Sequence, residues 1–205
     1  MLNPKLALCV LLVCYQGHAM ANPVMEIDAA VQPQMKLNES GAITSCGIRV
    51  LGLRTIGVSP ETLRVDGFDM STNIYDDEQV FGLSKVIFLQ GKIGESLQSG
   101  KYPVASPYKS FWLRSDTRTL KSSGKFITGG SAHSLMVGHD FSDAVQFIAE
   151  VLESQTLRLG LNFEDSTKNM AYVARIRIPP EDQREISQCL VGMAEKLQEE
   201  INQQR

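Results

Sequence analysis

The strongest constraint on the fold is a pair of cysteines that stand far apart in the sequence. The chain holds four cysteines, but Cys9 and Cys14 lie in an N-terminal leader that we expect to be removed, which leaves Cys46 and Cys189. An oxidising compartment favours a disulfide between them, and chain-entropy reasoning credits a loop of this length with at most about 5 kcal/mol. Two separate buried thiols are the alternative. A redox-active pair would need Cys-x-x-Cys spacing, which these two residues lack.

The leader has the three parts of a signal peptide. Lys5 supplies a positive charge, Leu6 to Val13 form a short apolar stretch, and Ala19-Met20-Ala21 matches the small-x-small pattern of a cleavage site. We expect residues 1–21 to be a signal peptide cleaved near Ala21, and the mature protein to be secreted or periplasmic. An uncleaved N-terminal anchor is the alternative, although the apolar stretch is shorter than the roughly 20 residues that span a bilayer. No later segment is longer and as apolar, so we expect no transmembrane span in the mature chain.

The charge balance is mildly acidic. The chain has 20 Lys and Arg and 23 Asp and Glu. Since the leader holds one lysine and no acid, the mature part carries 19 basic and 23 acidic side chains, a net charge of −4. Nucleic-acid-binding domains normally show a strong basic excess, so nucleic acid is not an expected partner. The length predicts one domain, placed at residues 43–205 after a loosely ordered N-terminal segment at 22–42 that Pro23, Pro33 and Gly41 interrupt.

Segments of strand character follow one another through the first part of this domain. Apolar and β-branched runs bounded by turn signals predict strands at Ile43–Ile56, Val80–Ile93 and Lys109–Arg114, and a hairpin or a bent strand at Leu63–Tyr75, where Asp66-Gly67 is a turn signal. Gly47 and Gly52 interrupt the first run, and a glycine inside a strand indicates a bulge or a close approach of another backbone.

The last third of the chain shows clearer periodicities. A helical pattern from about Ser142 to Glu153 predicts a short helix. The segments 156–163 and 170–178 alternate between apolar and polar residues, and the turn-forming EDSTKN between them predicts a hairpin. Pro179-Pro180 then introduces an amphipathic helix from about Glu181 to Asn202. We therefore expect an α+β fold, with an antiparallel sheet or sandwich of about six to eight strands, one short helix and a C-terminal helix packed on the sheet.

Arginines on the polar face of the hairpin are candidates for contact with an anion or a partner. A symmetric turn would set Arg158 directly opposite Arg175, with Arg177 one pair further along. Opposed cations are unfavourable by a few tenths of a kcal/mol, up to about 1 kcal/mol, without a counter-charge. An anionic ligand, the acids of a partner or the chain's own Asp and Glu could neutralise them. The alternative is a solvated edge on which the arginines fan apart.

Two histidines remain after the leader, His133 and His139, with Asp140 next to the second. A zinc site needs three or four ligands, so we expect no metal site. A Ser-His-Asp triad would have to use one of these histidines, but no Gly-x-Ser-x-Gly elbow surrounds the nearby serines. A hydrolase whose residues meet only in three dimensions is therefore an alternative function, built around His133, His139 and Asp140.

The leading functional expectation is an exported, non-enzymatic protein that acts by binding or by interaction with the cell envelope, without a cofactor. Its expected partners are an envelope protein or an anionic ligand. A subunit of an envelope assembly is the second alternative, and it would use the arginine face or the polar end of the last helix. The sequence carries no signal for an oligomeric state.

Overall fold

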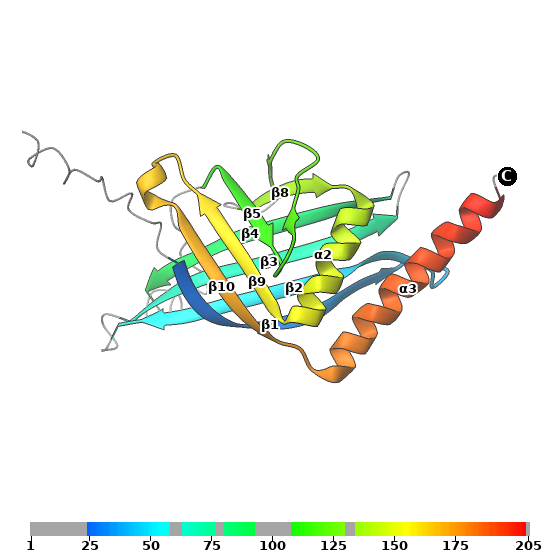
Figure 1. The fold of residues 1–205 in the computed structure, drawn as a ribbon, viewed down its shortest axis with the longest axis horizontal. Helices are drawn as coiled ribbons and strands as arrows, with labels where there is room; N and C mark the ends of the chain where they lie inside the picture. The colour runs from blue at the N-terminus through cyan, green and yellow to red at the C-terminus, as the bar shows by residue number, and fades with distance from the viewer. Residues whose placement is uncertain (1–23, 58–62, 77–79, 93–107, 130–133, 204–205) are drawn as a thin grey trace, which may run out of the picture.

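The structure is a computed structural model that describes residues 24–57, 63–76, 80–92, 108–129 and 134–203. It has the predicted α+β character, with a mostly antiparallel sheet and a helix at the C-terminal end (Figure 1). The sheet has ten strands within the described residues, more than the six to eight expected. The elements are β1 (Val24–Leu37), β2 (Ile43–Ile56), β3 (Arg64–Asp76), β4 (Val80–Lys92), β5 (Ser110–Arg114), β6 (Thr119–Leu120), β7 (Ile127–Thr128), β8 (Ser134–His139), α2 (Phe141–Ser154), β9 (Thr156–Asn162), the short 3-10 helix η1 (Ser166–Lys168), β10 (Met170–Arg177) and α3 (Pro180–Gln203).

The sheet is rolled so that its two edges approach each other. The strand order is β6-β5-β9-β10-β1-β2-β3-β4-β8-β7, so the edge strands β6 and β7 are neighbours in the sequence. Only residues 121–126 join them, which brings the two edges together. Across this seam the Ser123 amide donates to the Gly138 carbonyl at 2.9 Å, and His139 Nδ1 lies 2.7 Å from the Lys121 carbonyl oxygen. In Figure 1, β5, β9 and β10 accordingly cross in front of β2, β3 and β4.

Strand β1 corrects the expectation that residues 22–42 are loosely ordered. It lies in the middle of the sheet, parallel to β10 and antiparallel to β2. The reason is an alternation of buried and exposed residues over Met25–Val31, which gives the strand one apolar face. Pro33 does not break the strand, because pairing with β10 ends at Ala30 and only β2 still flanks β1 at the proline. A proline is tolerated at such a local edge.

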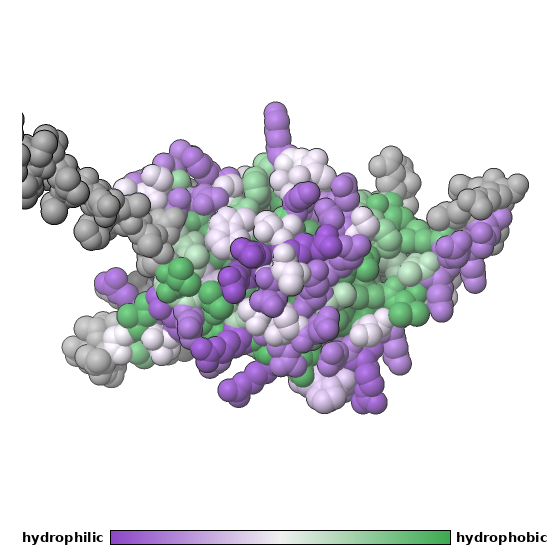
Figure 2. All heavy atoms as spheres, in the orientation of Figure 1, coloured by the Kyte–Doolittle hydropathy of each residue, from purple (hydrophilic) through white to green (hydrophobic). Residues whose placement is uncertain are grey.

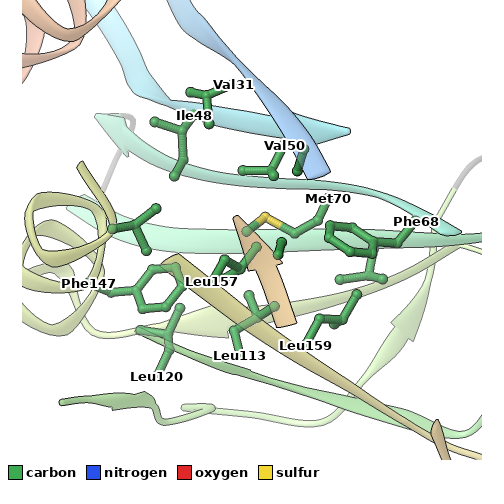
Figure 3. Close-up of a cluster of buried hydrophobic side chains, with 14 of the residues drawn as sticks. Val31, Ile48, Val50, Phe68, Met70, Leu113, Leu120, Phe147, Leu157 and Leu159 are labelled. Carbon is green, nitrogen blue, oxygen red and sulfur yellow. The ribbon is translucent and has the colours of Figure 1, made fainter. Parts of the chain in front are cut away.

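The core lies between the two layers of the rolled sheet, with α2 beside it. In Figure 3, side chains of β1, β2 and β3 face those of β5 and β9, and Phe147 of α2 points between them. The buried face of α2 comprises Ala144, Phe147, Ile148, Val151 and Leu152. Full burial of one large apolar side chain is worth about 1.5–3 kcal/mol, so this face binds α2 firmly to β3 and β4, which it contacts.

The C-terminal helix α3 packs on β1 and β2 and brings the two cysteines together. Ile186, Cys189 and Met193 form its buried face. The Cα atoms of Cys46 and Cys189 are 5.9 Å apart and their sulfurs are at bonding distance, as the sequence predicts. The Lys196 ammonium pairs with Asp76 near the end of β3. No helix within the described ranges combines the length and the apolar character needed to cross a membrane.

Candidate functional site

The β9–β10 hairpin exists as predicted, but its register differs by two residues from a symmetric turn. Leu161, and not Phe163, stands opposite Met170, and Leu159 stands opposite Tyr172. The loop is longer than assumed because Phe163 leaves the ladder, where its amide donates to Asn169 Oδ1 at 2.9 Å. The phenyl ring of Phe163 packs instead against the rings of Phe88 and Tyr108 in the core.

This register corrects the expected pairing of Arg158 with Arg175. Arg158 faces Val173 of β10, while Arg175 faces Thr156. Arg175 is neutralised by the chain itself, since its Nη2 lies 2.6 Å from Glu26 Oε2 in an exposed ion pair. The last arginine of the predicted set, Arg177, stands opposite Ala30 of β1 and is exposed.

Arg158 does stand opposite another arginine, on the other side of β9. Its partner in the ladder is Arg114 of β5. Neither guanidinium forms an ion pair with a described residue, and Arg158 Nε is buried without a hydrogen-bond partner among those residues. A buried polar atom left unpaired costs about 1–3 kcal/mol. Arg114 and Arg158, here called the arginine pair, are therefore two directly opposed cations without a counter-charge among the described residues.

Trp112 extends the arginine pair with an aromatic ring. It precedes Arg114 by two residues on β5, so both side chains point to the outer face of the sheet. A Cβ on Gly160, its cross-strand neighbour, would overlap the indole ring, which shows that the ring lies over the glycine. Trp112 keeps 37% of its surface exposed. The site thus combines two cations with one partly exposed aromatic ring. In Figure 2, drawn in the orientation of Figure 1, hydrophilic side chains cover much of the face on which β9 and β10 lie.

His139 is buried, and its two ring nitrogens form hydrogen bonds to two different segments of the chain. Its Nδ1 faces the Lys121 carbonyl at 2.7 Å and its Nε2 faces Ser84 Oγ at 2.9 Å. A carbonyl only accepts, so Nδ1 of the neutral ring carries the proton and Nε2 accepts from the Ser84 hydroxyl. Ser84 Oγ in turn lies 2.8 Å from Thr72 Oγ1. The chain of hydrogen bonds joins β3, β4 and β8 to the segment after β6.

The described residues give the hydrolase alternative no support. His133 lies outside them, and Asp140 is exposed beside α2 without a hydrogen bond to His139. Ser84 is fully buried, so its hydroxyl is not open to a substrate. Among the residues with described positions, no group of three His, Cys, Asp or Glu is arranged to hold a metal ion. A cavity of about 330 Å³ next to His139 is walled mainly by apolar side chains, including Phe111, Phe126 and Val137.

The stability of the fold is expected to fall on acidification through His139. Burial, the dominant cause, lowers the pKa of His139 below its ordinary value of 6.5, although the hydrogen bond to the Lys121 carbonyl and the charges of Asp143 and Asp140 act in the opposite direction. As the pH drops below 6.5, the unfolded chain binds a proton before the folded one does, so the free energy of unfolding decreases. Urea unfolding across about pH 5 to 7 measures this slope, and H139Q is expected to flatten it. Equal slopes for the two proteins would contradict this role.

No protein-family model, curated protein or solved structure matches this chain. The function must therefore be argued from the site itself. The sequence did not reveal Arg114 and Trp112 as site residues, although their alternation within KSFWLR marks a strand with both on one face. Their position beside Arg158 depends on the pairing of β5 with β9, about which the local sequence carries no information.

Proposed function

We propose that this chain is an exported, non-enzymatic protein that binds an acidic segment of an envelope protein through the arginine pair. One observation carries the proposal: Arg114 and Arg158 stand directly opposite each other on an outer sheet face without an acidic partner among the described residues. Two opposed cations destabilise a sheet unless something neutralises them. A carboxylate that bridges the two guanidinium groups would turn this cost into binding energy.

The chemistry of the arginine pair suits a carboxylate-rich ligand. A guanidinium presents a planar fork of donors that matches a carboxylate in two parallel hydrogen bonds. Arginine and tryptophan are also the residue types that most often dominate binding energy at protein interfaces. Trp112, partly exposed beside Arg114, offers apolar contact area for the segment that carries the acids.

An exported location rests on two independent features. The N-terminal leader resembles a signal peptide, and Cys46 and Cys189 lie at bonding distance, as expected in an oxidising compartment. Because an exported chain is located at or beyond the cell envelope, an envelope protein is the class of partner that we propose for it. A free anionic ligand would use the same two guanidinium groups, and a peptide probe separates the two cases.

The proposal is tested by the fluorescence of Trp112, which is the only tryptophan of the chain. A peptide of consecutive glutamates is expected to change its emission in a saturable way, and free glutamate is expected to bind more weakly. Because a hydrogen bond to a charged group is worth about 1.5–3 kcal/mol, R158Q and R114Q are each expected to weaken binding about tenfold or more.

The matched control is R177Q, which removes the same charge from an exposed position on β10 and is expected to leave the affinity unchanged. An absence of saturable binding would overturn the proposal. Equal losses in R158Q and R177Q would also overturn it, because they would show a general effect of net charge. Tighter binding of free glutamate than of the peptide would favour a small anionic ligand over an envelope protein.

A further inference from the structure

The outer face of the four long strands carries a hollow beside a glycine. Gly47 of β2 lies between Gln34 of β1 and Asn73 of β3 in one cross-strand row. A Cβ at Gly47 would collide with the Thr72 carbonyl and with the side-chain amide of Asn73. The absence of a side chain at Gly47 therefore lets the Asn73 side chain lie close against β2, beside the hollow.

The hollow is a groove of measurable size between two rows of polar side chains. It has a volume of about 340 Å³, and an overlapping hollow of about 230 Å³ shares Gln34, Lys36, Asn73 and Tyr75 with it. Arg49, Ser71 and Lys85 form one flanking row. Lys36 and Tyr75 stand in the other, and the Lys36 Nζ atom lies 5.9 Å from the centre of the tyrosine ring. We refer to this depression as the Gly47 groove.

An unpaired side-chain amide oxygen lies beside the hollow. Asn73 is 6% exposed and lines both hollows, yet its Oδ1 accepts no hydrogen bond from the described residues. Such an atom costs the fold about 1–3 kcal/mol. The terminal torsion of asparagine is soft, so a modest rotation could turn the amide toward a molecule seated in the groove. A ligand hydroxyl, which both donates and accepts, would pair with the amide in either orientation.

The groove carries a net positive charge. Arg49 and Asp69 neutralise each other through two hydrogen bonds, Nε to Oδ1 at 2.9 Å and Nη2 to Oδ2 at 2.6 Å. Lys36 and Lys85 remain, one in each flanking row, and neither forms an ion pair with a described residue. An anionic group is therefore the complement that these two ammonium groups lack.

From this arrangement we propose that the Gly47 groove binds a small, hydroxyl-rich anion, either a sugar acid or a sugar phosphate. The amides of Gln34 and Asn73 and the hydroxyl of Ser71 would pair with the hydroxyls, and Lys36 and Lys85 with the charge. The volume lies at the low end of the 300–1,000 Å³ range of ligand sites, which suits one small molecule. The groove lies on β1–β4, whereas the arginine pair lies on β5 and β9, so this site is separate from the one proposed above.

The test is a titration of the whole mature protein with each probe molecule, monitored through the NMR signals of its side-chain amides. Galacturonate and glucose 6-phosphate are the two anionic probes. Galactose is the control without a charge, and inorganic phosphate is the control without a hydroxyl-bearing ring. At least one sugar anion is expected to shift the Asn73 and Gln34 amide signals in a saturable way. The sugar anion with the lower dissociation constant identifies which anionic group, carboxylate or phosphate, the groove prefers.

Two variants separate specific binding from nonspecific charge effects. K85Q is expected to lower the affinity for the more tightly bound sugar anion at least about fivefold. K168Q, at an exposed lysine of η1, is expected to leave this affinity unchanged. Absence of saturable shifts with both sugar anions would overturn the proposal. So would binding of galactose as tight as that of galacturonate, binding of phosphate as tight as that of glucose 6-phosphate, or equal losses in the two variants. None of these results bears on the arginine pair, which R158Q tests separately.

Discussion

Replacing Cys46 and Cys189 together by alanine is expected to lower the free energy of unfolding by about 2–5 kcal/mol. The two residues are 143 positions apart in the sequence, so a bond between them removes much of the conformational freedom of the unfolded chain. In the folded state the bond holds α3 against β2, where Cys46 is fully buried. Urea unfolding of the double variant and of the oxidised wild type measures the difference.

Chemical reduction supplies the control for this prediction, since it opens the bond without changing the sequence. The reduced wild type is expected to unfold at nearly the same urea concentration as the double variant. A double variant that unfolds together with the oxidised wild type would show that the two sulfurs do not form a stabilising bond. Stability lost in the variant but retained on reduction would assign the effect to packing of the two side chains.

Replacing Asp66 by alanine is expected to cost about 3 kcal/mol, the lower end of the usual loss when a buried ion pair is broken, because the Arg54 side chain keeps 33% of its surface exposed. Asp66 of β3 is 2% exposed in the interior of the roll. Its Oδ2 accepts from Arg54 Nη2 at 2.8 Å and from Nε at 3.2 Å, and its Oδ1 accepts from the Tyr172 hydroxyl. Removal of the carboxylate leaves a guanidinium and a buried hydroxyl without their acceptor.

Asp69 provides the matched control for Asp66, because it also pairs with an arginine of β2 but lies on the opposite face of β3. D69A breaks the pair with Arg49, whose side chain is 44% exposed, and exposed pairs contribute about 0.2–1 kcal/mol. Urea unfolding of both variants at neutral pH tests the contrast. Equal losses would contradict the rolled arrangement, in which one face of β3 points inward and the other points to solvent.

Local patterns in the sequence locate most strands, because a half-buried strand leaves a period of two in the chain. This period predicts the hairpin of β9 and β10, and the helical spacing of three and four residues predicts the amphipathic helix α3. Strand β1 has the same period over Met25–Val31, but the prolines that flank this stretch suggested a loose segment. The structure explains the difference, since Pro33 lies past the last residue of β1 that pairs with β10.

Contacts that depend on pairing between distant strands could not be read from the sequence. A symmetric turn predicts the wrong register for β9 and β10, because Phe163 leaves the ladder and packs against core rings from other parts of the chain. The opposition of Arg114 and Arg158 follows from the pairing of β5 with β9, which are separated along the chain by β6, β7, β8 and α2. A glycine at position 47 indicates either a bulge or a close backbone approach, but its place between Gln34 and Asn73 follows only from the pairing of β1, β2 and β3.

The central claim is that an exported sheet is joined covalently to its C-terminal helix, and one measurement tests it most directly. Protein isolated from its native compartment, with thiols blocked during lysis, is digested and analysed by mass spectrometry without reduction. The account predicts one linked peptide pair containing Cys46 and Cys189, in a chain whose first residue lies just after Ala21. Two blocked free thiols at these positions would contradict both the covalent joint and the oxidising location inferred from it.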